Sequence, residues 1–238
     1  MTNHRIVFTL LFAFSGIAAQ GWAQYPFQAN VNLVLGFPQN EFHKNVDKIG
    51  FGMEGHFAYN LPKTPVLIGA SLSYLIYGSE TRQEPFSTTI PDVWVDVTTT
   101  NSLVMGHLLL RLQSPARALR PYVDGLVGFH FLTTDTKIEN QKNNETVAES
   151  NNFNDFTGSY GGGGGIMIQV YHTEGNESTQ SREMSVYVDF GFRYLKGGKA
   201  EYLKEGSIRR EKNGKVLYDV TRSTTDIVTY HLGVGFCF

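Results

Sequence analysis

The sequence has 238 residues, one cysteine and a formal charge of −2 from 20 basic and 22 acidic residues. This length fits one domain or one barrel, and the lack of a basic excess argues against a nucleic-acid partner. A lone cysteine excludes an intramolecular disulfide and shows no spacing typical of a metal cluster, so we expect no cofactor and no metal site.

The first 23 residues have the features of a secretory signal peptide. Arg5 gives a positive start, an apolar run extends over 6–19, and Gly21-Trp22-Ala23 is a small-x-small cleavage site. The apolar run is too short for a membrane-spanning anchor, and the only cysteine, Cys237, is too far away for N-terminal lipidation. We expect a signal peptide over 1–23 and a mature domain over 24–238.

After Ala23 the chain has no apolar run long enough for a membrane-spanning helix. It has instead segments of about ten residues in which apolar and polar residues alternate, which is the period of a strand with one apolar face. Eight such segments follow one another, over 27–37, 49–59, 66–76, 101–112, 123–131, 166–170, 184–194 and 228–238, with a start of the fourth near Val93 as an alternative.

The two faces of these segments differ in composition. The apolar face has no charged residue and carries Tyr and Phe near the strand ends. The other face is rich in Gly, Ser and Asn, has no Lys, and carries the charged residues Glu54, Arg111, Asp124, Asp189 and Arg193. A soluble lipocalin-like barrel would instead have a charged exterior. We therefore predict an all-β fold, an eight-stranded antiparallel transmembrane up-and-down β-barrel, with lipid outside and a polar lumen.

The connections support this topology. Those over 39–47, 79–93, 133–155 and 196–225 are long and polar, whereas those over 61–65 and 113–120 are short, as periplasmic turns are. Both termini would then be periplasmic. The connection over 171–182 is longer than this scheme expects. The stretch 133–155 is typical of a mobile hydrophilic extracellular loop.

Four histidines share the polar face with the five charges. These are His56, His107, His130 and His231. They could form a proton path or a catalytic set, or they could fill a narrow lumen as a compensated network, and eight strands leave room for little more than side chains. No spacing of Ser, His and Asp or Glu indicates a hydrolase, so no catalytic residue is predicted.

Two further motifs allow different interpretations. Gly161 to Gly165 lacks the Gly-Lys-Ser/Thr of a phosphate loop, so we interpret it as the start of a strand. Around an Asn213-Gly214 turn, 208–211 and 216–220 predict a hairpin that extends strands seven and eight. Its basic residues are either a solvated tip or a contact for anionic lipopolysaccharide; they are Arg209, Arg210, Lys212 and Lys215.

The most specific motif is the last eight residues, from His231 through Gly233 and Phe236 to Phe238. Together with Arg120-Pro121-Tyr122-Val123, which resembles the opening of a strand in such proteins, it is similar to the small outer-membrane barrels of Gram-negative bacteria, OmpA-, OmpX- and OmpW-like members of the porin family. The resemblance implies the outer-membrane location and an assembly signal in His231, Gly233, Phe236 and Phe238 for the barrel-assembly machinery.

The resemblance does not fix an activity, because such barrels serve several roles. We expect a non-enzymatic protein with a structural or surface-interaction role, long extracellular loops and a side-chain-filled lumen. Its partners would be outer-membrane lipid, lipopolysaccharide and an unknown surface ligand. The alternative is a narrow channel or carrier for small or hydrophobic solutes, and a third possibility is a lipid-modifying enzyme.

Overall fold

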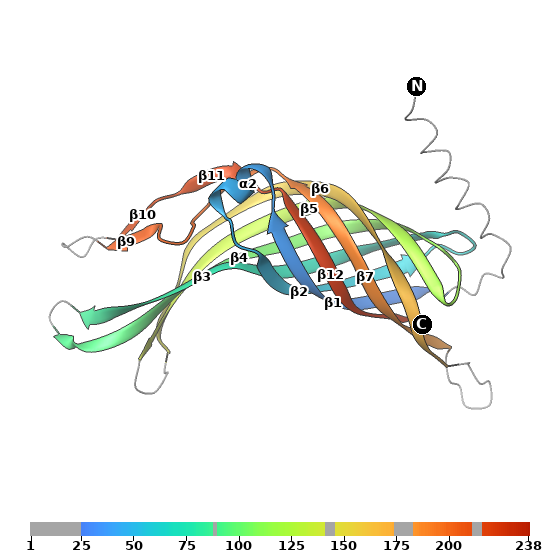
Figure 1. Ribbon diagram of the computed structural model, residues 1–238, viewed down its shortest axis with the longest axis horizontal. Helices are drawn as coiled ribbons and strands as arrows, with labels where there is room; N and C mark the ends of the chain where they lie inside the picture. The colour runs from blue at the N-terminus through green and yellow to red at the C-terminus, as the bar shows by residue number, and fades with distance from the viewer. Residues whose placement is uncertain (1–24, 88–89, 141–145, 174–182, 211–215) are drawn as a thin grey trace, which may run out of the picture.

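A computed structural model describes residues 25–87, 90–140, 146–173, 183–210 and 216–238. Eight antiparallel strands form a closed barrel in the order β1-β12-β7-β6-β5-β4-β3-β2, so every strand lies between its neighbours along the chain (Figure 1). This confirms the predicted up-and-down barrel. The proposed signal peptide lies outside the described residues.

The barrel strands are β1 (Phe27–Pro38), β2 (Gly50–Asn60), β3 (Val66–Ser87), β4 (Ile90–Gln113), β5 (Leu119–Asn140), β6 (Thr146–Thr173), β7 (Met184–Gly197) and β12 (Ile227–Cys237). The short helix α2 (Asn40–Asn45) follows β1. Between β7 and β12 lie two small ribbons, one of β8 (Lys199–Tyr202) with β11 (Thr221–Thr224) and one of β9 (Ile208–Arg210) with β10 (Val216–Tyr218). Within the described residues, no helix is both long and apolar enough to cross a bilayer.

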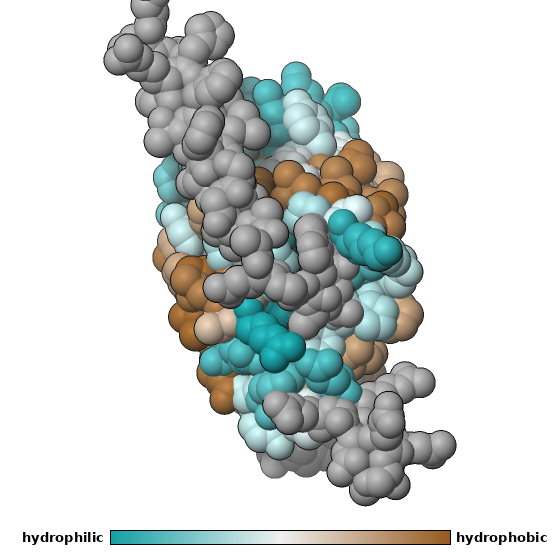
Figure 2. All heavy atoms as spheres, turned by 90° about the vertical axis from the view of Figure 1, so that its right-hand side faces the viewer, coloured by the Kyte–Doolittle hydropathy of each residue, from teal (hydrophilic) through white to brown (hydrophobic). Residues whose placement is uncertain are grey.

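Side chains alternate between the outside and the lumen along each strand. In β7, for example, Val188, Phe190 and Phe192 are exposed, whereas Asp189 and Arg193 are buried. Figure 2, which faces one end of the barrel, shows hydrophobic residues on its flanks and hydrophilic residues around its centre. Apolar residues on the outside and ionic residues on the inside are the arrangement of a barrel that is surrounded by lipid.

The two ends of the barrel differ. At one, which we call the terminal end, β1 starts and β12 ends, and short turns over 61–65 and 114–118 connect β2 to β3 and β4 to β5. β6 ends and β7 starts at this end as well, and residues 174–182 between them are outside the described part. At the other, the loop end, β1 is followed by α2 and the four strands β3 to β6 continue beyond their neighbours (Figure 1).

This extension corrects the prediction of loops over 79–93 and 133–155. Strands β3 and β4 pair as far as Ser87 and Ile90, and β5 and β6 pair as far as Glu139 and Thr146. Polar side chains stabilise the ladder across the strands: the Thr81 and Thr98 hydroxyls lie 2.9 Å apart, and those of Thr99 and Thr136 lie 3.1 Å apart. The stretch 133–155 is therefore mostly paired sheet.

The glycine run is also placed differently from the prediction. β6 starts at Thr146, so Gly161 to Gly165 lie inside the strand and not at its start. Gly163 pairs with Asp124 on one side and Arg193 on the other. A Cβ atom there would collide with the backbone oxygen of Phe192, so only glycine fits between these two neighbours.

The two strands flanking the predicted hairpin turn pair with each other as β9 and β10, whereas the Asn213-Gly214 turn itself lies outside the described residues. The pair does not simply prolong strands seven and eight. The described residues 198–210 and 216–226, which we call the strap, cross the mouth of the barrel from β7 to β3. Two contacts attach it to β3: Arg82 donates to the backbone oxygen of Ile208 at 2.9 Å, and the Gly206 amide donates to Glu80 at 3.0 Å. A third joins Glu205 to Lys48, just before β2, at 2.6 Å. The strap therefore covers the loop end.

Candidate functional site

The candidate site is the network of polar side chains inside the barrel. The structure places all nine predicted lumen residues there, each at most 5% exposed: Glu54, His56, His107, Arg111, Asp124, His130, Asp189, Arg193 and His231. They come from β2, β4, β5, β7 and β12, so the alternation of every one of these strands contributes to the same interior.

Two arginines and two carboxylates form the centre of the network. Arg111 donates two hydrogen bonds to Asp124, at 2.7 and 2.9 Å, in the parallel geometry that is the strongest for such a pair. Arg193 lies 3.3 Å from the same carboxylate and also binds Glu54. Ser73 donates a hydrogen bond to Glu54 at 3.0 Å. Each charge therefore has a charged partner, which offsets the cost of its burial.

The third carboxylate, Asp189, is held mainly by neutral donors. Asn30 and Tyr122 each donate a hydrogen bond to it at 2.8 Å. Tyr122 also lies 2.8 Å from Nε2 of His231, and the guanidinium of Arg111 stacks 3.6 Å from the centre of the Tyr122 ring. Tyr122 thus connects Asp189 to the arginine pair. It belongs to the Arg120–Val123 motif, but sequence reasoning did not assign it to the lumen.

The other histidines lie around this centre. His56 Nδ1 is 3.5 Å from Glu54, His107 Nε2 is 2.8 Å from the Ser159 hydroxyl, and His130 Nδ1 is 3.0 Å from the Thr225 hydroxyl. The last contact joins the barrel wall to the strap. Among the described residues, no group of three or more His, Cys, Asp or Glu side chains is arranged to hold a metal ion.

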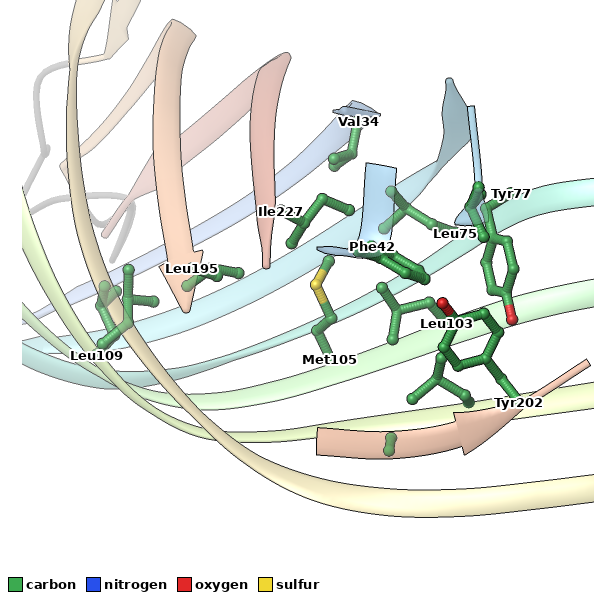
Figure 3. Packing of buried hydrophobic residues seen from close by; sticks show 14 residues of the cluster. Val34, Phe42, Leu75, Tyr77, Leu103, Met105, Leu109, Leu195, Tyr202 and Ile227 are labelled. Atoms are coloured by element: carbon green, nitrogen blue, oxygen red, sulfur yellow. The ribbon is translucent and has the colours of Figure 1, made fainter. Parts of the chain in front are cut away.

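A second, apolar layer closes the lumen, and it corrects the prediction of a polar lumen. It consists of the buried cluster in Figure 3: Val34, Phe42, Val46, Leu75, Tyr77, Leu103, Met105, Leu109, Leu126, Leu132, Leu195, Ala200, Tyr202 and Ile227. Most of it lies on the loop-end side of the charged network. On β4, Leu103 comes before His107 and Arg111, and on β7, Leu195 comes after Arg193.

Helix α2 completes this apolar layer from above. Phe42 is fully buried, and its ring meets those of Tyr77 and Tyr202 edge-on, with centres 5.7 and 5.4 Å apart (Figure 3). Tyr202 comes from the strap, and its hydroxyl lies 2.9 Å from that of Ser223. Burial raises the pKa of this tyrosine. The first connection and the strap therefore pack together over the lumen.

The terminal end of the lumen is filled by Arg120. Its guanidinium lies 4.6 Å from the ring centre of Tyr187 and 5.7 Å from that of Tyr25, and 3.6 Å from the sulfur of Cys237. Cation–aromatic contacts of this kind stabilise a desolvated arginine. Neither Tyr25 nor Tyr187 stood out in the sequence, because a single inward tyrosine does not disturb the alternation.

A serine, a histidine and a glutamate also meet at this end. The Ser185 hydroxyl lies 3.0 Å from His172 Nδ1, and His172 Nε2 lies 3.9 Å from Glu183. However, Ser185 is completely buried, and its hydroxyl is also bound by Tyr25 at 2.7 Å and by Gln169 at 3.0 Å. A hydroxyl that is enclosed and shared in this way has no access to a substrate, so we interpret the group as structural.

No protein-family model and no curated protein sequence matches the chain. Among solved structures, Neisserial surface protein A matches with 10% identity and a TM-score of 0.38, covering 89% of this chain and 95% of that one. The N-terminal β-barrel domain of Pseudomonas aeruginosa OprF has 14% identity and a TM-score of 0.33, with 89% and 97% covered.

A major outer membrane protein from Thermus thermophilus gives 10% identity and a TM-score of 0.39, with 89% of this chain and 99% of that chain covered. The chain is similar to bacterial outer-membrane β-barrels. At these levels of identity the likeness concerns the fold, and the role of this barrel has to be argued from its own residues.

The remaining predicted residues of this barrel are not brought into one site. His231 and Gly233 face the lumen, whereas Phe236 and Phe238 lie outside, and the Phe238 ring is 6.1 Å from that of Phe27. Arg209 is exposed on β9. For Arg210 only the backbone is described, and Lys212 and Lys215 lie outside the described residues, so the predicted basic contact at the hairpin tip stays a prediction.

Proposed function

We propose that the protein is a non-enzymatic outer-membrane barrel that carries a surface-interaction structure, with the loop end outside the cell and both termini in the periplasm. The observation that carries this proposal is the closed lumen. The charged network, the apolar layer and the strap follow one another along the barrel axis, so the interior serves to stabilise the wall and not to pass solutes.

The extended wall supports the surface role. β6 pairs with β7 only from Ser159 onward, so its outer edge over 146–154 has no neighbouring strand among the described residues. An unpaired edge is a template to which an extended segment of a partner protein can add as a further strand. The opposite edge, on β3, differs because the strap binds it through Ser79 and Arg82. The wall therefore presents one covered edge and one open edge.

A conductance measurement tests the closed lumen. In planar bilayers, the mature protein should give no steady open level. A stable ohmic conductance would instead support the narrow channel or carrier.

Cysteine labelling in intact cells tests the orientation. The buried native thiol is first replaced by Cys237→Ser, so that the introduced cysteine is the single thiol of the mature protein. Glu149→Cys on the exposed edge of β6 should react with a membrane-impermeant maleimide, whereas Ala118→Cys in a terminal-end turn should react only after the outer membrane is opened. The reverse pattern would mean that the barrel is inserted the other way round.

The barrel-assembly machinery stays the proposed partner during biogenesis, and outer-membrane lipid the proposed surrounding. Neither proposal depends on the conductance result.

A further inference from the structure

A basic hollow lies at the loop end, on the side where the strands are short. Six residues of α2 and of the β8–β11 ribbon line a space of about 590 Å³: Glu41, Lys44, Asn45, Lys199, Arg222 and Ser223. Three of them are cations and one is an anion, in a chain whose net charge is −2. This hollow is therefore a local concentration of positive charge, and such a concentration attracts anions.

The walls of the hollow are fixed from both sides. The Thr224 amide on β11 donates to the Glu41 carboxylate of α2 at 3.2 Å, so this anion already has a partner. Below them, Phe42 packs against Tyr202 of β8. In the ribbon, Lys199 is opposite Thr224 and Arg222 is opposite Glu201. The helix and the ribbon are thus held together before any ligand arrives, which lowers the cost of binding one.

The three cations are available. Lys44, Lys199 and Arg222 are exposed, and among the described residues none of them forms an ion pair. Other surface cations differ: Lys48 binds Glu205, and Lys137 binds Glu139 at 2.6 Å. Arginine and lysine together suit a phosphate group, the first through paired donors and the second as a point charge.

The height of the hollow indicates which phosphate can reach it. Outward-facing aromatic rings lie at the loop end of β1, β7 and β12, with Phe37 5.6 Å and Phe192 6.5 Å from Tyr230. Such rings mark the membrane–water interface of a transmembrane barrel. Asn40, at the start of α2, donates a hydrogen bond to the hydroxyl of Tyr194 in this belt at 3.3 Å. The hollow therefore begins directly above the interface.

We propose that this hollow binds a phosphate group of lipopolysaccharide in the surrounding outer leaflet. The inference rests on the proposed outer-membrane location and orientation. It is distinct from the open edge of β6, which would bind protein, and from the basic hairpin tip.

The test is a binding titration of the mature protein in detergent micelles, in which neither membrane orientation nor conductance plays a part. The probes are lipopolysaccharide, the same lipid after enzymatic removal of its phosphates, and inorganic phosphate. We expect the phosphorylated lipid to bind most tightly and its affinity to fall with added salt. Lys44→Gln, Lys199→Gln and Arg222→Gln should each weaken binding about fivefold.

The matched control is Lys137→Gln, which removes an exposed lysine that already has a partner on the distant wall and should leave the affinity unchanged. Equal affinity for the phosphate-free lipid, or equal losses for Lys137→Gln and Arg222→Gln, would overturn the proposal. Binding of inorganic phosphate without binding of the lipid would overturn the lipid assignment. None of these results would change the conductance or labelling tests of the proposed function.

Discussion

The charged network and the apolar layer fill the same lumen by opposite means. In the network, closure depends on pairing, since Arg111, Asp124, Arg193 and Glu54 are stable in the interior only as a set. In the apolar layer, closure depends on close packing around Phe42 and involves no buried charge. A narrow barrel can thus be closed twice, and the two closures should fail in different ways.

The largest effect is expected when the pairing is broken. Arg193→Ala would leave Glu54 with no guanidinium and Asp124 with only one, so we expect a loss of about 3–5 kcal/mol in the free energy of unfolding. Urea unfolding in detergent, followed by tryptophan fluorescence, measures this. Adding Glu54→Gln should recover part of the loss, and a single variant as stable as the parent would contradict the paired network.

A smaller and less specific effect is expected in the apolar layer. Leu103 is 1% exposed, and Leu103→Ala should cost about 3 kcal/mol through lost burial and the cavity that remains. Unlike Arg193→Ala, Leu103→Ala leaves no buried charge without a partner. The effect of a second substitution, Glu54→Gln, on the free energy of unfolding should therefore simply add to that of Leu103→Ala. A Leu103→Ala variant rescued by Glu54→Gln would mean that the two layers are not separate.

The outside of the wall provides the reference for both layers. Val188 faces outward beside the buried Asp189, and Val188→Arg should cost roughly 2–4 kcal/mol if this position lies near the middle of the bilayer. Refolding into lipid vesicles at a series of urea concentrations measures the cost. Val216→Arg, at an exposed position in the strap, is the control, and equal tolerance of both would mean that the faces are inverted.

The smallest effect concerns the strap. The hydrogen bond to Glu205 raises the pKa of Lys48, so this contact is complete below the ordinary lysine pKa and is lost as the pH rises through the raised value. Hydrogen exchange of the amides around Gly206 should therefore increase at alkaline pH beyond its intrinsic rise. Glu205→Gln should show the faster exchange already at neutral pH. An unchanged exchange rate would mean that the contact between Lys48 and Glu205 does not hold the strap in place.

The same contrast explains what the sequence could and could not predict. Charged residues such as Arg111 and Asp189 alternate with apolar neighbours, so their place in the lumen follows from the period of two. On β4, Leu108, Leu109 and Leu110 follow one another, and Leu109 points inward while the others point outward. Where both faces of a strand are apolar, the period of two does not show which residues point inward, so it cannot predict the apolar layer inside the lumen. Periodicity also does not predict the strand extensions, because Thr99 and Thr136 belong to stretches that are polar on both faces.

The register between the first and last strands has a consequence for how the chain assembles. Gln28 and Cys237, which lie 209 positions apart in the sequence, become partners when β1 meets β12, whereas β3 with β4 and β5 with β6 pair residues that are close in the sequence, such as Ser87 with Ile90. Local pairing loses less chain entropy than distant pairing. The hairpins should form early and the β1–β12 seam last, and the strap can be attached only after β3 is in place. Cysteine cross-linking across each interface during refolding would reveal this order.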